Sequence, residues 1–164
     1  MAAQDAISGM VTDGTNSAGQ ILISNASNTC AMIGGQQQLS NGQTLFIRIG
    51  TVDGGVDSAP AAPGVFPVVP EPQSKFVTKG PIAIVWYEAK DATCTGIYGN
   101  DRPSGTITLT RGDANGYSGT FDMTFPASLS TDPPAGHITG SFDTTACAAM
   151  RNFVGFDGLT GTCK

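Results

Sequence analysis

Alternation between apolar and polar residues runs through most of this 164-residue chain and predicts β-strands. The clearest pattern occurs twice, first as Gly119–Thr124 (GTFDMT) and again as Gly140–Thr145 (GSFDTT). In each copy, apolar side chains point to one face of a strand and polar side chains point to the other. Eight strands can be delimited in this way, and they are Ala6–Thr12, Gln20–Ala26, Thr44–Thr51, Gly64–Val69, Pro81–Ala89, Gly105–Arg111, Tyr117–Phe125 and His137–Asp143.

Helix signals are few. Asn28–Ile33 is expected to form a short helical turn with Asn28 as its N-cap, and a second turn is expected around Ala148–Phe153. Segments rich in Gly, Pro and Asp, such as Asp53–Pro63, separate the strands and are typical of surface loops. Many short strands with Gly-rich turns predict an all-β fold, specifically an antiparallel β-sandwich of about eight or nine strands with a C-terminal meander and little helix. The length predicts a single domain, residues 1–164.

The last three expected strands constrain one another's register. At the first hairpin, a three-residue loop, Ala114–Gly116, sets Leu109 opposite Phe121 on one face. Aligning the two copies of the repeat then sets Phe121 opposite Phe142. The meander is therefore expected to bury one face of apolar side chains and to expose a face rich in threonine and aspartate.

Composition narrows the class of partner. The chain carries 8 basic and 13 acidic residues, and its net charge of −5 argues against a nucleic-acid partner and against an anionic membrane surface. No apolar run reaches the roughly 18–20 residues of a membrane-spanning helix. No motif for a cofactor is present, and the expected partner is a glycan or another protein of the cell envelope.

Four cysteines, Cys30, Cys94, Cys147 and Cys163, lie too far apart for a C-x-x-C metal or redox motif. An even number of cysteines in a Gly- and Thr-rich chain favours two disulfides and therefore an oxidising, extracytoplasmic compartment. Buried free thiols are the alternative. The sequence does not choose among the three pairings. We favour Cys30–Cys94 with Cys147–Cys163, because the second would tie the tail to the end of the last repeat strand.

The expected polar face holds the main candidates for a binding site. Asp122 and Asp143 are predicted to be diagonal neighbours there, roughly 5.5–8 Å apart. Paired carboxylates can hold a cation, contact a glycan or act as general acid and base. On an open face with no desolvating wall they make poor general acids. Tyr87 is a third candidate, because Trp86 is expected in the core and Tyr87, on the opposite face of the same strand, could stack on a sugar.

Catalysis finds little support elsewhere in the sequence. His137 is the only histidine, so a Ser-His-Asp triad would have to use it, and the chain contains no Gly-x-Ser-x-Gly motif. The tripeptide Arg111-Gly112-Asp113 is expected to be a chance match to a cell-adhesion motif. Asp53–Asp57 lacks the glutamate that completes an EF-hand loop. These observations favour a protein that is not an enzyme and has no metal site.

Several segments across residues 20–147 have patterns that are mostly typical of β-hairpins. They are Ser24-Asn25 leading to Thr29-Cys30-Ala31, Gly64–Val68, Asp91–Cys94, Ser104–Thr110, Gly119–Phe125 and Ile138–Asp143, the last ending near a cysteine. Together they resemble a broad set of predicted exported lipoproteins from myxobacteria and related bacteria. The resemblance implies a β-sandwich at the cell envelope, secreted or lipid-anchored in its precursor. It brings no established activity and no catalytic residue.

The sequence therefore favours a non-catalytic, extracytoplasmic protein of the cell envelope with a structural or binding role. The alternative is a glycan- or cation-binding module that uses the polar sheet face through Asp122, Asp143 and Tyr87. A hydrolase is the least favoured of the three hypotheses.

Overall fold

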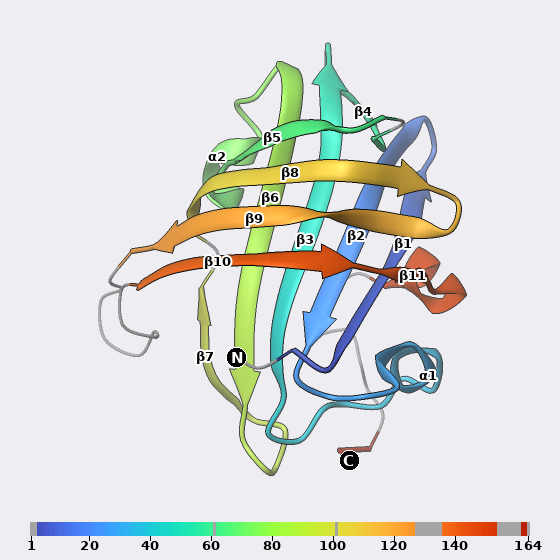
Figure 1. Ribbon diagram of the computed structural model, residues 1–164, viewed down its shortest axis with the longest axis vertical. Coiled ribbons are helices and arrows are strands. Elements are labelled where there is room, and N and C mark those ends of the chain that lie inside the picture. Colours follow the sequence, from blue (N-terminus) through green and yellow to red (C-terminus); the bar gives the residue numbers. More distant parts are fainter. Residues whose placement is uncertain (1–2, 61, 101, 127–135, 154–161, 164) are drawn as a thin grey trace.

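The chain folds as one curled β-sheet whose two halves pack face to face. The structure, a computed structural model, describes residues 3–60, 62–100, 102–126, 136–153 and 162–163. In Figure 1 the strands of one half run across those of the other, so the sheet makes two layers with a core between them.

Four long strands form the first layer, and they pair antiparallel in the order β6-β3-β2-β1. They are β1 (Asp5–Asp13), β2 (Asn16–Ser24), β3 (Gln43–Asp53) and β6 (Lys79–Lys90). The second layer has the order β10-β9-β8-β5 and holds both copies of the repeat. Its strands are β5 (Gly64–Val68), β8 (Ser104–Asp113), β9 (Gly116–Phe125) and β10 (Gly136–Asp143).

Short elements complete the fold. β4 (Val56–Ser58) pairs with β3, β7 (Gly96–Asn100) pairs with β6, and β11 (Thr145–Ala146) pairs with β1. Helical structure in the described part of the chain comprises α1 (Thr29–Gly34), α2 (Glu71–Ser74) and the 3₁₀ helix η1 (Ala148–Asn152). Sequence alternation did not predict β4, β7, β11 or α2, each of which is at most five residues long.

The all-β class with little helix is confirmed, but the arrangement matches an antiparallel sandwich only in part. β5 and β6 run parallel and join the two layers through one residue pair, Val68 opposite Ala83. β1 and β11 also run parallel. The strands therefore form one mixed sheet, whose path begins at β10 and ends at β11. Because β11 follows β10 in the chain, one short stretch, residues 136–146, supplies both ends of that path.

Alternation along β3 sorts its side chains between two apolar clusters. Leu45, Ile47 and Ile49 point into the core between the layers and are at most 1% exposed. Phe46 points to the outer face of the first layer and belongs to the second cluster. The members of that cluster on α1, η1 and the surrounding strands and loops include Ile7, Leu22, Ile33, Leu39, Met150 and Phe153.

The C-terminal meander buries its apolar face as expected, but in a different register. Phe121 lies opposite Gly140 and Phe142 lies opposite Gly119, so the expected pairing of the two phenylalanines is wrong. A Cβ added to Gly140 would lie 2.4 Å from Cζ of Phe121, because the aromatic ring occupies the space over the glycine. The second pair differs, because the atoms nearest to a Cβ added to Gly119 would belong to the backbone of Thr108 and Leu109 and not to Phe142.

The β8–β9 hairpin also differs from the expected three-residue loop. Asp113 begins a two-residue turn, and the register then shifts between Leu109 and Arg111 at a β-bulge. Leu109 consequently lies opposite Gly119 and not opposite Phe121. The bulge absorbs one residue and keeps the apolar side chains on the core side, so alternation alone does not reveal it.

The expectation of two disulfides is confirmed, but the favoured pairing is wrong. Cys30 pairs with Cys147, and Cys94 pairs with Cys163. α1 carries Cys30 and packs against η1, which begins after Cys147, so these cysteines meet although they are 117 positions apart. Two disulfides indicate an oxidising, extracytoplasmic compartment. None of the helices in the described ranges is both long enough and apolar enough to span a membrane.

Candidate functional site

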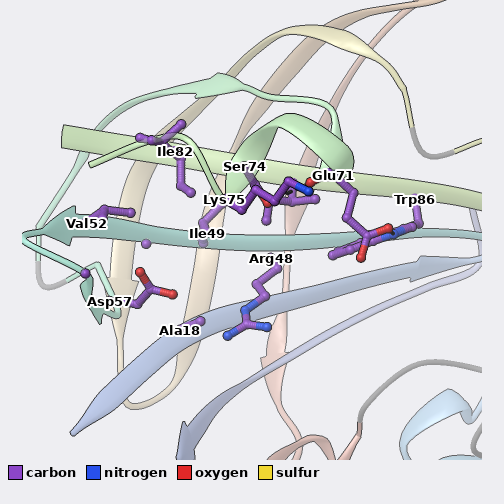
Figure 2. Close-up of a pocket in the computed structure, with 14 residues that line it drawn as sticks. Ala18, Arg48, Ile49, Val52, Asp57, Glu71, Ser74, Lys75, Ile82 and Trp86 are labelled. Atoms are coloured by element: carbon purple, nitrogen blue, oxygen red, sulfur yellow. Dashed lines mark hydrogen bonds between the residues drawn. The ribbon is translucent and has the colours of Figure 1, made fainter. Parts of the chain in front are cut away.

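A groove lies on the outer face of the first layer. Its volume is about 350 Å³, at the lower end of the roughly 300–1,000 Å³ that small-molecule sites occupy. Strands β2, β3 and β6 form its floor, and α2 and β4 form its walls (Figure 2). The floor residues are Ala18, Arg48, Val52, Ile82, Ile84 and Trp86, and the wall residues include Asp57, Glu71, Ser74 and Lys75.

Strand alternation explains why Arg48 reaches this groove. It stands between Ile47 and Ile49, whose side chains face the core, so its own side chain faces outward. Ile84 lies directly opposite Arg48 on β6, and Gln20 lies directly opposite it on β2. Arg48 is therefore central to three paired strands, with an apolar neighbour on one side and an amide on the other.

A hydrogen bond holds α2 against the floor of the groove. Nε1–H of Trp86 donates to Oε2 of Glu71 at 3.1 Å. α2 lies on the connection between β5 and β6, which are parallel strands and therefore need a crossover rather than a tight turn. The Trp86 ring also stacks on Phe46, with 5.3 Å between the ring centroids. Trp86 thus joins the groove to the second apolar cluster.

The Arg48 side chain is partly buried, and no hydrogen bond or ion pair to its guanidinium occurs within the described residues. In Figure 2 it extends from β3 over β2, whereas the Glu71 carboxylate lies beside the indole that donates to it. Lys75, the other basic residue of the groove, is exposed and holds its ammonium 5.2 Å from the centre of the Phe76 ring. A guanidinium presents five N–H donors in a planar fork that matches a carboxylate. Arg48 is therefore the group of this groove best placed to bind an anion.

A second unsatisfied polar group lies beside Arg48. Gln20 is 3% exposed, and its Nε2 donates to the carbonyl oxygen of Phe153 at 3.0 Å. Its Oε1 is buried and accepts no hydrogen bond from the described chain. Buried polar atoms usually have a partner. Two neighbouring polar groups on this face are thus left to interact with something other than the described chain.

The structure separates the two aspartates that the sequence predicted to be neighbours. Asp122 lies opposite Thr139, and Asp143 lies opposite Ser118. The two aspartates are therefore about 13 Å apart along the strands, at roughly 3.3 Å per residue. The predicted contact between them is wrong because the true register differs by two residues from the one that aligned the repeats.

Each of these aspartates has a basic partner of its own. Nε2 of His137 lies 2.7 Å from Oδ1 of Asp122, and Nη2 of Arg111 lies 2.7 Å from Oδ1 of Asp143. Hydrogen bonds from Ser118 and then Arg111 hold the pKa of the Asp143 carboxyl below its usual range. The hydrogen bond to Asp143 in turn raises the pKa of Arg111. The polar face is thus a surface of threonines and compensated charges.

Tyr87 does not lie on the open face where it was expected, and Trp86 packs against the second apolar cluster on the outer face. Tyr87 packs against the core between the layers, where its ring centroid lies 6.2 Å from that of Phe125. Trp86 lines the groove. In the hairpin tripeptide, Arg111 contacts Asp113 at 3.2 Å, so both charged groups of that motif are engaged. Among the described residues there is no group of three or more His, Cys, Asp or Glu side chains that could hold a metal ion.

Sequence reasoning missed the groove, and of its charged residues it considered only Asp57, as part of the loop Asp53–Asp57. Arg48 is the only charged residue in the expected strand Thr44–Thr51. A lone arginine in an otherwise apolar strand is the signal that could have identified it. Glu71 and Lys75 belong to a Pro-rich segment whose place against β6 depends on the crossover from β5 to β6, and no local pattern predicts that crossover.

No protein-family model, curated protein or solved structure matches the chain. The groove is therefore interpreted from the chemistry of its own residues. The groove offers an apolar floor, two carboxylates and a guanidinium that no group in the described part of the chain pairs with. These groups are suited to holding a small molecule in a fixed orientation.

Proposed function

We propose that this chain is a non-catalytic, exported binding domain of the cell envelope and that its ligand occupies the groove. The observation that carries the proposal is the Arg48 guanidinium, which lies partly buried on the floor of a groove of small-molecule size and has no partner among the described residues. Withdrawing a charge from water costs free energy unless a partner replaces the water. A ligand in the groove would supply that partner. The two disulfides support export, in a secreted or lipid-anchored form.

The polar sheet face is less suited to this role. A glycan or cation bound by Asp122 and Asp143 would have to displace His137 and Arg111 from them, and it could not bridge two carboxylates about 13 Å apart. A hydrolase built on His137 would have to work in the open, because the His137 and Asp122 side chains are 58% and 66% exposed. Such exposure keeps water in the site and weakens electrostatic stabilisation of a transition state.

Trp86 is the only tryptophan of the chain, so its fluorescence reports on the groove directly. The test is a titration with a library of small soluble molecules, followed by indole fluorescence and by amide NMR shifts. Molecules that alter the fluorescence are expected to shift amides of β3, β6 and α2 and to leave those of β8–β10 in place. Shifts confined to β8–β10 would contradict the proposal, as would a library in which no molecule binds.

A filled groove provides the matched control. Ala18→Leu places extra side-chain volume on the floor and is expected to abolish binding. Thr120→Leu introduces the same side chain on the exposed polar face and is expected to leave binding unchanged. Thermal unfolding of both variants verifies that the fold is retained.

A further inference from the structure

We infer that the ligand of the groove is a small organic monoanion, a carboxylate with an apolar body, and that Arg48 binds its carboxylate. This inference rests on the proposed function and adds the chemistry of the ligand to it. Three features of the groove carry the inference: the position of its unpaired cation, the line of apolar side chains beside that cation, and the carboxylates in its walls.

The negative group of the ligand follows from Arg48. A guanidinium can donate two parallel N–H bonds to one carboxylate, and such charge-assisted pairs are stronger than neutral hydrogen bonds. Arg48 is partly withdrawn from water on the floor, where screening is weaker than at the rim. Lys75 is exposed on the wall and its ammonium lies over Phe76, so it competes poorly for the same anion.

The apolar body of the ligand follows from β6. Ile84 lies directly opposite Arg48. Ile82 and Trp86 occupy the neighbouring outward positions of the same strand, and all three side chains line the groove. This line extends over about 13 Å at roughly 3.3 Å per residue. An apolar chain or aryl group that lies along β6 would contact it while the carboxylate reaches Arg48 on β3.

The limit of one negative charge follows from the walls. Asp57 and Glu71 both line the groove, and Glu71 is held in place because it accepts the hydrogen bond of the Trp86 indole. The whole chain carries a net charge of −5. A dianion such as a phosphate monoester would therefore gain one guanidinium and meet two carboxylates, whereas a monocarboxylate is balanced by Arg48 alone.

The test compares acids with their uncharged amides. Octanoate is paired with octanamide, 3-phenylpropionate with its primary amide, and phenyl phosphate serves as the dianion. Affinities are measured by Trp86 fluorescence and by calorimetry. Each acid is expected to bind at least about tenfold more tightly than its amide, and phenyl phosphate is expected to bind more weakly than 3-phenylpropionate.

Variants assign these differences to named side chains. Arg48→Gln is expected to weaken acid binding by about ten- to a hundredfold and to leave amide binding unchanged, as loss of a charge-assisted hydrogen bond implies. Arg48→Lys keeps the charge without the fork, so intermediate affinity is expected, and it supplies the test where Arg48→Gln does not fold. Arg151→Gln removes the same charge from η1, outside the groove lining, and should have no effect. Glu71→Gln keeps an acceptor for the indole and is expected to improve phenyl phosphate binding several-fold.

The outcomes separate this inference from the proposed function. Equal affinity for acids and amides, retained in Arg48→Gln, would overturn the monoanion while the groove remained a binding site. Tighter binding of phenyl phosphate than of 3-phenylpropionate would overturn the limit to one charge. If no probe altered Trp86 fluorescence but members of the broad library did, the ligand class would be wrong and the proposed function would stand. Failure of the library as well would overturn the proposed function itself.

Discussion

Replacing Cys30 and Cys147 together by alanine removes the disulfide that connects α1 to the start of η1. The bond closes a loop of 117 positions, and loop-closure entropy for that length gives about 5 kcal/mol of stabilisation at 25 °C. The bond between Cys94 and Cys163 closes 69 positions and gives about 4 kcal/mol by the same relation. Chain entropy alone therefore predicts nearly equal losses for the two alanine pairs.

Packing makes the two losses differ. Cys147 is 3% exposed within the second apolar cluster, and Cys30 packs against that cluster. Cys94 is also buried, at 9% exposure, but it belongs to neither apolar cluster, and its partner Cys163 is exposed. Removing buried sulfur atoms also costs contacts, at about 1 kcal/mol per deleted group or more. The Cys30/Cys147 alanine pair is thus expected to lose at least about 1 kcal/mol more than the Cys94/Cys163 alanine pair.

Urea titrations followed by Trp86 fluorescence and by far-ultraviolet circular dichroism measure both free energies of unfolding. Peptide mapping of the unreduced wild-type protein establishes the pairing independently. A loss below about 1 kcal/mol for the Cys30/Cys147 pair would refute the reasoning, as would a larger loss for the Cys94/Cys163 pair. A peptide that contains Cys30 joined to Cys94 would contradict the fold at this point.

Other regions of the fold give three further expectations. A Cβ on Gly19 would lie 2.6 Å from Oη of Tyr117, so Gly19→Ala should lower the free energy of unfolding, measured by urea titration, by about 1–3 kcal/mol. In the control Gly96→Ala the added Cβ would meet no atom within 4 Å, so the free energy of unfolding should change by less than about 0.5 kcal/mol. Equal losses in the two variants would count against the close packing at Gly19. The hydrogen bond from Ser118, and then that from Arg111, lowers the pKa of Asp143, so its contribution to stability is present above the unfolded-state pKa of about 4 and is lost as pH falls through the lower folded-state pKa. Asp143→Asn should therefore reduce the dependence of the free energy of unfolding on pH in this acidic range. An unchanged dependence would refute the assignment. Burial raises the pKa of Tyr117, so its contribution is complete below pH about 10 and is lost as pH rises through the folded-state pKa; Tyr117→Phe should remove that alkaline loss in thermal melts, and persistence of the loss would show another cause.

Local alternation predicted most of the long strands because it depends only on which face of each strand is buried. The expected strand Thr44–Thr51 lies within β3, and Pro81–Ala89 lies within β6. Register was harder to predict, because aligning the two copies of the repeat residue by residue set Phe121 opposite Phe142. The structure instead sets Phe121 over Gly140, an arrangement in which the small residue makes room for the large one.

The candidate site depends on contacts that no local pattern encodes. Arg48 stands out in the sequence as the single charge in an apolar strand. Its role in a binding site, however, depends on α2 and β4, which form the walls of the groove around it. Glu71 reaches the floor only because a crossover carries α2 from β5 to β6, where Trp86 donates a hydrogen bond to it. The disulfide pairing has the same origin, since α1 and η1 meet through long-range packing.

The placement of both ends of the sheet path in residues 136–146 has a consequence for the order in which the chain can fold and form its disulfides. The N-terminal part of the chain emerges first, so β1 can pair with β2 early. Its second neighbour, β11, can pair with it only after residues 145–146 have emerged. Until Cys147 emerges, the available thiols are Cys30 and Cys94, which are not partners in the folded protein. Early oxidation would therefore join the wrong pair and would have to be reversed by thiol–disulfide exchange. Efficient maturation thus requires that the thiols stay reduced, or that an isomerase reshuffles them, until the last strands have paired.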